Sequence, residues 1–204
     1  MAKETGLEIR YVVDTHVHAD HVSSGRELAR AAGAEYVLHA SAGAAYEHRA
    51  VRDGERLELG NIVAEVLHVP GHTPEHIALV VTDRARAADP WVAFTGHTLM
   101  VGDMGRTELA SSAEDGARAL YESAARLRAL PDYVAVLPGA FSGSVCGRGL
   151  SGNPSSTIGF ERRFNAAFRI DDRDAFVARM LLDVPPRPPD AARTRAANLG
   201  HSEP

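Results

Sequence analysis

The chain has 204 residues, 45% of them hydrophobic, and a formal net charge of -5 with a sequence pI near 6.0, which suits one domain with a substantial core. Nucleic-acid binding is disfavoured because phosphate contacts require a basic face, and neither membrane insertion nor export is expected because the chain has no run of about 18 apolar residues and no apolar leader. The single cysteine, Cys146, excludes an internal disulfide and a cysteine-rich zinc module, and it agrees with a cytoplasmic location.

The first predicted element is a strand over residues 9–13, followed at once by Asp-Thr-His-Val-His-Ala-Asp-His at 14–21. Strand side chains alternate in direction, so His16, His18 and Asp20 can leave on one side, and His21 joins them as the chain turns. Zinc and similar metals bind imidazole and carboxylate ligands at about 2.0–2.2 Å, which requires such convergence. A solvated, histidine-rich loop is the alternative. We interpret the segment as a metal site at the end of a buried strand.

The rest of the first half alternates apolar runs with turn residues. A helix is predicted over about residues 26–32, ended by Gly33. Further strands are predicted at residues 35–39, 62–69, 77–82 and 91–95, with a hairpin arm at 56–59. Several of these strands end in short polar loops rich in glycine and histidine, an arrangement in which a β-scaffold presents a site at one edge.

The second half is more helical. Ser111 to Glu114 resembles a capping box, and the helix that follows ends at Pro131. A strand is predicted at 132–137. Phe160, Phe164 and Phe168 recur at helical spacing, and we interpret this aromatic stripe as core packing.

Residues 185–189 are Pro-Pro-Arg-Pro-Pro, and the chain stays rich in arginine and alanine beyond them. Proline-rich segments of this kind act as spacers rather than as part of a core. We therefore expect one domain over residues 1–184, followed by a mobile tail or linker at 185–204.

Three later loops, each containing glycine, follow predicted strands: residues 70–76 (Pro-Gly-His-Thr-Pro-Glu-His), 95–98 (Thr-Gly-His-Thr) and 138–143 (Pro-Gly-Ala-Phe-Ser-Gly). Their order and spacing over about residues 9–165 resemble the metallo-β-lactamase superfamily. The resemblance implies an α/β (α+β) fold, an αββα sandwich with its metal site at one edge of two sheets. Residues 94–99 and 102–108 resemble the branch of persulfide dioxygenases and glyoxalase II, which act on glutathione-derived sulfur compounds.

Position by position, the resemblance assigns His16, His18 and His72 to a first metal site, and Asp20 and His21 to a second. Two positions depart from the family pattern. The family carries a carboxylate after Thr-Gly, where this chain has His97. The family carries a further histidine after Pro-Gly, where this chain has Ala140.

Counting ligands leaves His16, His18, His72 and His97 for one divalent ion, Fe(II) or Zn(II). The second site keeps only Asp20 and His21 and lacks a bridging carboxylate. We therefore predict a mononuclear centre beside a degenerate second site. Asp103, six residues after His97, is a weaker candidate to replace the missing carboxylate.

Related persulfide dioxygenases are expected to hold iron with two histidines and one carboxylate, and the corresponding set here is His16, His72 and His97. A neutral set carries one less negative charge, so it should bind an anionic thiolate or persulfide at least as readily. We expect a persulfide dioxygenase-like enzyme acting on a small thiol derivative such as glutathione persulfide.

Two other functions stay open. A Zn-dependent thioester hydrolase of glyoxalase II type could use a single zinc-bound water, with Asp20 orienting that water or accepting its proton. A degenerate, non-catalytic metal-binding or interaction module is the third hypothesis, motivated by His97, Ala140 and the short segment before His16.

The remaining polar and titratable residues are expected to have structural or supporting roles, apart from Arg106. His76 is expected to support the site rather than ligate the metal, and Cys146 to be a small packed residue. Arg106 either binds substrate or forms a structural ion pair with Asp103 or Glu108. Relatives usually carry more strands before the first motif. Either the first sheet is reduced here, or the chain begins inside an ancestral domain, in which case a homo-oligomer or a partner chain could cover the uncovered part of the core.

Overall fold

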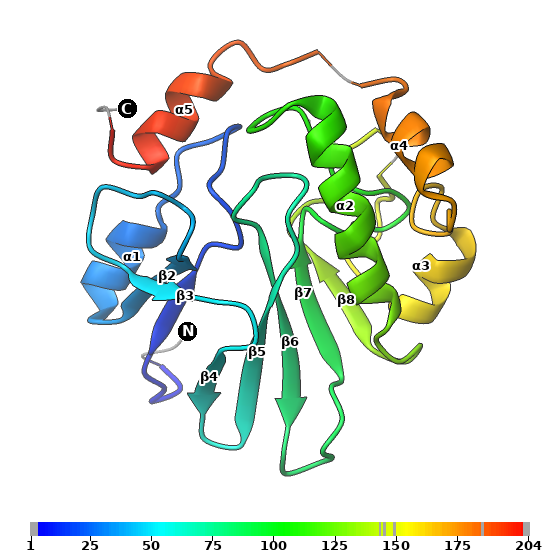
Figure 1. Ribbon diagram of the computed structural model, residues 1–204. Helices are drawn as coiled ribbons and strands as arrows, with labels where there is room; N and C mark the ends of the chain where they lie inside the picture. The colour runs from blue at the N-terminus through cyan, green and yellow to red at the C-terminus, as the bar shows by residue number, and fades with distance from the viewer. Residues whose placement is uncertain (1–3, 143, 145, 149, 185, 202–204) are drawn as a thin grey trace.

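The computed structural model describes residues 4–142, 144, 146–148, 150–184 and 186–201 (Figure 1). Its smaller sheet contains strands β1 (Tyr11–Val13), β2 (Glu35–His39) and β3 (Arg49–Val51), paired in parallel in that order. Helix α1 (Gly25–Ala32) connects β1 to β2. It ends at Gly33, which has a φ of 66° and donates its N–H to the carbonyls of the last turn, as predicted for a glycine C-cap.

The larger sheet has six strands in sequence order. Its strands are β4 (Arg56–Leu59), β5 (Ile62–His68), β6 (Ile77–Asp83), β7 (Val92–Gly96), β8 (Ala135–Pro138) and β9 (Ser156–Thr157). Neighbours pair antiparallel except β7 and β8, which are parallel because helix α2 (Ala113–Arg128) crosses between them. Ser112 caps α2 by accepting a hydrogen bond from the Asp115 N–H.

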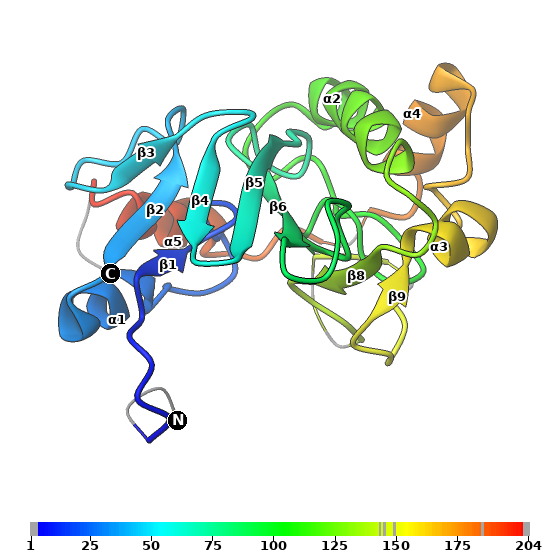
Figure 2. The same cartoon turned by 90° about the horizontal axis from the view of Figure 1, so that it is seen from below.

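Three further helices follow: α3 (Ile158–Phe164), α4 (Arg173–Leu181) and α5 (Ala191–Asn198). Figures 1 and 2 show α2, α3 and α4 gathered on the larger sheet, with α1 and α5 beside the smaller one. None of the helices in the described part of the chain has both the length and the apolar character needed to cross a bilayer.

Successive side chains of a strand point to opposite faces of its sheet, so each sheet packs on the other sheet with one face and on helices with the other. In β2, Val37 points into the core between the two sheets, while Tyr36 and Leu38 pack with Ala29 of α1. On the larger sheet, Ala78, Ala93 and Val136 pack in the cluster that contains α2 instead. The order helix, sheet, sheet, helix is the αββα sandwich that the sequence resemblance implies.

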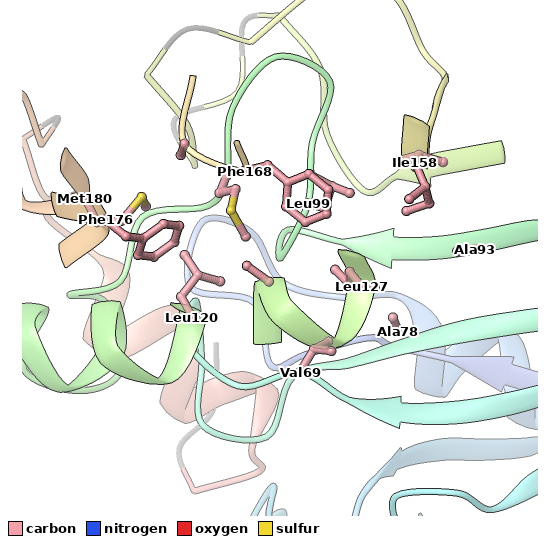
Figure 3. Packing of buried hydrophobic residues seen from close by; sticks show 14 of the residues in the cluster. Val69, Ala78, Ala93, Leu99, Leu120, Leu127, Ile158, Phe168, Phe176 and Met180 are labelled. Carbon is pink, nitrogen blue, oxygen red and sulfur yellow. The ribbon is translucent and has the colours of Figure 1, made fainter. Parts of the chain in front are cut away.

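The largest cluster lies between α2, the larger sheet and the loops that follow (Figure 3). Leu120 and Leu127 of α2 are fully buried there, together with Phe168, Phe176 and Met180. Each such side chain contributes about 1.5–3 kcal/mol when it is fully removed from water. Val69 and Leu99, which lie close in sequence to His72 and His97, are buried in this cluster.

The aromatic stripe differs from the prediction. Phe160 and Phe164 are 55% and 64% exposed, and only Phe168 is buried. The helix ends at Phe164 because Asn165 adopts an extended conformation and its side chain accepts hydrogen bonds from the N–H groups of Ala167 and Phe168. The helical spacing therefore stops before the third phenylalanine, and the interpretation as one core stripe is wrong for the first two.

The carboxy-terminal segment contacts the rest of the chain where the structure describes it, and the division into a domain at residues 1–184 and a tail or linker at 185–204 stays a prediction. Within residues 186–201, helix α5 bonds to the loop after β1, through Arg195 and Asn198. Pro185 and the last three residues lie outside the described residues.

Within the described residues the smaller sheet has three strands and the larger one six, and a reduction of the first sheet stays a prediction. Leu79 of β6 and Leu137 of β8 pack against the cluster between the sheets and are only partly buried.

Candidate metal centre

Three histidines converge at one edge of the sandwich. His16 follows β1 of the smaller sheet, whereas His72 and His97 follow β5 and β7 of the larger one. Their candidate ligand atoms all lie within 4.8 Å of one another, and the three residues are only 2–3% exposed. The two sheets thus deliver their ligands to one buried point, as the strand-end loops predict.

Hydrogen bonds set the ring orientations. His72 Nδ1 lies 2.7 Å from the Arg106 carbonyl oxygen, which requires Nδ1 to donate and leaves Nε2 for a metal. That Nε2 lies 3.2 Å from His97 Nδ1. His16 Nδ1 bonds the Thr15 hydroxyl at 3.0 Å, which leaves its own Nε2. Gly105 is required nearby, because a Cβ there would lie 2.2 Å from the His97 carbonyl oxygen.

Burial keeps these imidazoles neutral. It lowers the pKa of His72 to about 4, with the Arg106 carbonyl opposing the shift. Burial, followed by mutual repulsion among the histidines, puts the pKa values of His16 and His97 well below the usual value. Neutral imidazole is the form that binds a metal, so this donor set fits one Zn(II) or Fe(II) ion.

His76 contacts the candidate ligands and belongs to neither ligand group found among the described residues. Its Nε2 accepts a hydrogen bond from the His97 N–H at 3.0 Å, and its Nδ1 lies 3.0 Å from the Thr98 hydroxyl. Because that hydroxyl donates to the Val69 carbonyl, His76 Nδ1 is the donor to it. Both ring nitrogens are therefore engaged. Gly96, at φ 52°, makes this packing feasible, since a Cβ there would lie 2.5 Å from His76 Cε1.

A second, more exposed group of candidate ligands contains His18, Asp20 and His21, again with ligand atoms within 4.8 Å of one another. Asp20 Oδ1 lies 3.0 Å from His21 Nδ1 and 3.8 Å from His18 Nδ1. Burial alone would raise the pKa of Asp20, but His21, a backbone N–H and His18 outweigh it and lower that pKa.

His18 lies between the two groups. Its ring centroid is 4.3 Å from that of His16 and 6.2 Å from that of His97. Within the described residues, its Nδ1 is buried without a hydrogen-bond partner. The structure therefore joins three of the four predicted first-site histidines and places His18 beside Asp20 and His21. A role for His18 in the first site stays a prediction.

The other candidates have structural partners. Asp103 forms a buried two-point ion pair with Arg148, at 2.9 and 3.1 Å, and it belongs to neither ligand group found among the described residues. Arg106 is buried and forms an ion pair with Glu108, which is one of the two roles expected for it. The backbone carbonyl of Arg106 accepts the hydrogen bond from His72 Nδ1.

Cys146 is 1% exposed, and its Sγ lies 3.8 Å from Asp20 Oδ2. Burial, reinforced by the Asp20 charge, raises the pKa of its thiol to about 11, so the thiol stays protonated at neutral pH. Cys146 is thus a packed residue, as expected. Ala140 offers no ligand atom.

Two sets of residues around the site were not predicted from the sequence. Asp14 accepts hydrogen bonds from Tyr36 and Ser23 and so anchors the start of the β1 loop. Glu75 is 1% exposed and pairs with Arg195 of α5. Burial alone would raise the pKa of Glu75, but the bonds from Arg195 and from the Val17 N–H outweigh it and lower that pKa. Glu75 lies in a loop that the sequence singled out, whereas no local signal indicates Arg195.

The chain is similar to known proteins of one superfamily. The family model of the metallo-beta-lactamase superfamily matches residues 2–139. The chain is 34% identical over 109 residues to the mitochondrial persulfide dioxygenase ETHE1 of Bos taurus, covering 53% of this chain and 40% of that protein. It is 34% identical over 138 residues to a hydroxyacylglutathione hydrolase of Methylobacterium sp. (strain 4-46), covering 67% and 50%.

Among solved structures, ETHE1 from Myxococcus xanthus is similar with a TM-score of 0.80 and 30% identity, covering 99% of this chain and 82% of that one. The sequence resemblance and the predicted fold are confirmed by these matches. The chain spans half or less of the length of the two curated relatives described above.

Proposed function

Because the chain belongs to the metallo-beta-lactamase superfamily, we propose that it is a persulfide dioxygenase-like metalloenzyme with one divalent ion, Fe(II) or Zn(II), at a mononuclear centre. The substrate is a small thiol derivative such as glutathione persulfide. The observation that carries the proposal is the buried, neutral set of His16, His72 and His97, whose ligand atoms lie within 4.8 Å of one another.

These three histidines would hold the ion, with His18 adjoining them. Bound iron would supply the redox chemistry by which oxygen is transferred to sulfur. The donors are uncharged, so they leave the full positive charge of the ion to attract an anionic persulfide. Because the three histidines are buried, few water molecules can reach the ion and compete with the substrate for it.

Asp20 is the candidate proton acceptor. Its side chain is 22% exposed and its pKa is lowered, so the carboxylate is ionised at neutral pH and open to solvent. It lies beside His18 at the rim of the buried set. From there it can accept the proton of an entering thiol or persulfide, or orient a water molecule.

A second candidate function is a Zn-dependent hydrolase of thioesters. It is supported by the similarity to a hydroxyacylglutathione hydrolase and by the second group of His18, Asp20 and His21. Hydrolysis requires an activated water, which a zinc ion provides by lowering the pKa of its bound water to about 7.

One experiment separates the two. The protein is purified anaerobically without added metal, its Fe and Zn contents are measured, and oxygen uptake with glutathione persulfide is compared with cleavage of a glutathione thioester. About one Fe per chain with oxygen uptake supports the dioxygenase. Stoichiometric Zn with thioester cleavage and no uptake favours the hydrolase. Metal without either reaction leaves a binding module.

A further inference from the structure

Helix α5 contacts the ligand loop that follows β1, although the two are about as far apart in the chain as its length allows. Figure 1 shows α5 lying against this loop at the site edge of the sandwich. Arg195 and Asn198 of the helix make hydrogen bonds to this loop, and Ala191 packs against Ala19 within it. Both polar side chains form hydrogen bonds to backbone groups or to a buried carboxylate, whose positions the fold determines.

Asn198 uses its whole amide on the segment from His18 to Ser23. Its Nδ2 donates to the carbonyls of His18 and His21 at 2.9 and 2.8 Å, and its Oδ1 accepts the Ser23 N–H at 2.9 Å. Two carbonyls require donors and one N–H requires an acceptor, so only an amide satisfies all three. The segment held in this way contains Asp20.

Arg195 joins two ligand loops. Its guanidinium donates to the Val17 carbonyl at 3.0 Å and makes a two-point contact with Glu75 at 2.9 and 3.1 Å. Glu75 in turn accepts the Val17 N–H at 2.9 Å. Val17 separates His16 from His18, and Glu75 lies three residues after His72.

Ligands on separate loops bind a metal tightly only when the loops keep a fixed separation. Here the loops belong to different sheets, and the pair of Arg195 and Glu75 bridges them. Among the described residues, no member of α5 belongs to the two largest clusters, and Ala191 packs in a small cluster with Leu109 and with Ala19 of the β1 loop. Its contacts therefore act on the site more than on the core.

We propose that Arg195 and Asn198 are both positioning residues: the first holds the β1 and β5 ligand loops at their metal-binding separation, and the second fixes the conformation of the β1 loop. The inference rests on the metal centre of the proposed function and is independent of substrate and reaction. Loss of either residue should weaken metal binding about 10–100-fold, the range observed when supporting contacts of metal ligands are removed.

The test compares R195Q and N198D with R193Q, a matched control on the same helix whose side chain is 69% exposed. Metal affinity of each purified full chain is measured by competition with a chelator for Zn(II), and the Co(II) absorption spectrum reports coordination geometry. Circular dichroism confirms that the variants fold. We expect weaker binding and an altered Co(II) spectrum in R195Q and N198D, and wild-type behaviour in R193Q.

A double-mutant cycle separates positioning from general destabilisation. E75Q removes the charge that R195Q leaves uncompensated, so the effects of E75Q and R195Q on metal affinity should be less than additive. R195K, which keeps the charge without the two-point contact, should recover part of the affinity and remains available if R195Q does not fold.

The proposal is overturned if folded R195Q and N198D bind metal as the wild type does, or if R193Q weakens binding equally. A wild type that binds metal tightly yet oxidises no persulfide and cleaves no thioester refutes the proposed function alone. A wild type without tight metal binding overturns both.

Discussion

Nε2 of His72 lies 3.2 Å from Nδ1 of His97, and both rings are buried. The Arg106 carbonyl accepts a hydrogen bond from the Nδ1–H of His72, so His72 Nε2 presents a lone pair toward His97. Without a cation, the two nitrogens must share a proton. A divalent ion can instead accept a lone pair from each nitrogen. Metal binding would therefore account for the cluster of neutral imidazoles at this edge of the two sheets.

We expect one tightly bound ion per chain, bound through this pair. At free metal about 1,000 times Kd, binding adds about 4 kcal/mol to the free energy of unfolding, which raises Tm by roughly 10 °C. H72A and H97A should each abolish most of this increase, whereas H48A, outside both ligand groups, should keep it. Metal analysis and calorimetry with and without chelator measure both quantities. Two tightly bound ions in the wild type would contradict the prediction.

Acid should destabilise the metal-free protein. His72 has a pKa of about 4 in the folded state, against about 6.5 in the unfolded chain, so the unfolded state binds more protons between these values. The free energy of unfolding therefore falls as pH decreases from about 6.5 to about 4, by about 3 kcal/mol from His72 alone.

Urea denaturation of metal-free protein at several pH values checks this, with H72Q expected to flatten the dependence and exposed H201Q expected to leave it unchanged. A metal-free wild type of equal stability at pH 4.5 and pH 7 would show that His72 is not held neutral by folding.

Gly96 and Gly43 offer a matched pair of substitutions. Both have positive φ, 52° and 72°, but a Cβ at Gly96 would lie 2.5 Å from His76 Cε1, whereas a Cβ at Gly43 meets nothing within 4 Å. G43A should cost only the left-handed strain, about 1 kcal/mol, whereas G96A adds a clash and displaces the His76 that bonds the His97 N–H. We expect weakened metal binding in G96A alone, measured by chelator competition. Equal metal affinities in the two variants would argue against His76 as a support for His97.

The pair of Asp103 and Arg148 should matter for stability and not for metal. Their side chains are 1% and 9% exposed, so D103N leaves a buried guanidinium without its partner and should cost about 3–5 kcal/mol. E114Q breaks an exposed pair on α2 and should cost less than about 1 kcal/mol. Denaturation and metal analysis test this together. Loss of the bound ion in folded D103N would mean that Asp103 is a ligand after all.

The sequence is informative where structure is local. His16, His72 and His97 each follow a strand, and strand ends are marked by alternation and turn residues, so their convergence is predictable. The break at Asn165 is also local, but it depends on a side chain bonding the backbone ahead, which apolar periodicity does not report. Phe160 and Phe164 were misplaced for that reason.

The features of the site that the sequence does not predict depend on contacts between residues far apart in the chain. Arg195 meets Val17 and Glu75 across most of the chain, in a segment whose composition indicates a linker. Hydrogen bonds to backbone carbonyls leave no periodic pattern. The division of ligands between two groups, with His18 beside Asp20, likewise depends on ring orientation that a motif does not fix.

The two departures from the family pattern can be reversed. The Gly139 N–H bonds the Gly96 carbonyl at 2.8 Å, and a Cβ at Gly139 would lie 3.1 Å from His97 Cδ2, so position 140 adjoins the centre. H97D restores a carboxylate that can bridge two ions, and A140H adds a donor to the group of His18, Asp20 and His21. We expect H97D/A140H to bind two Zn(II) ions per chain, against one in the wild type, because a bridging carboxylate offsets the repulsion between two cations.

Isothermal titration and metal analysis after gel filtration count the ions, with A140S as the control that changes position 140 without adding an imidazole. Thioester cleavage should rise in the double variant, since two ions can hold a hydroxide between them. A double variant that still binds one ion would mean that His18, Asp20 and His21 cannot reach a common metal, and that the loss of the second site extends beyond His97 and Ala140.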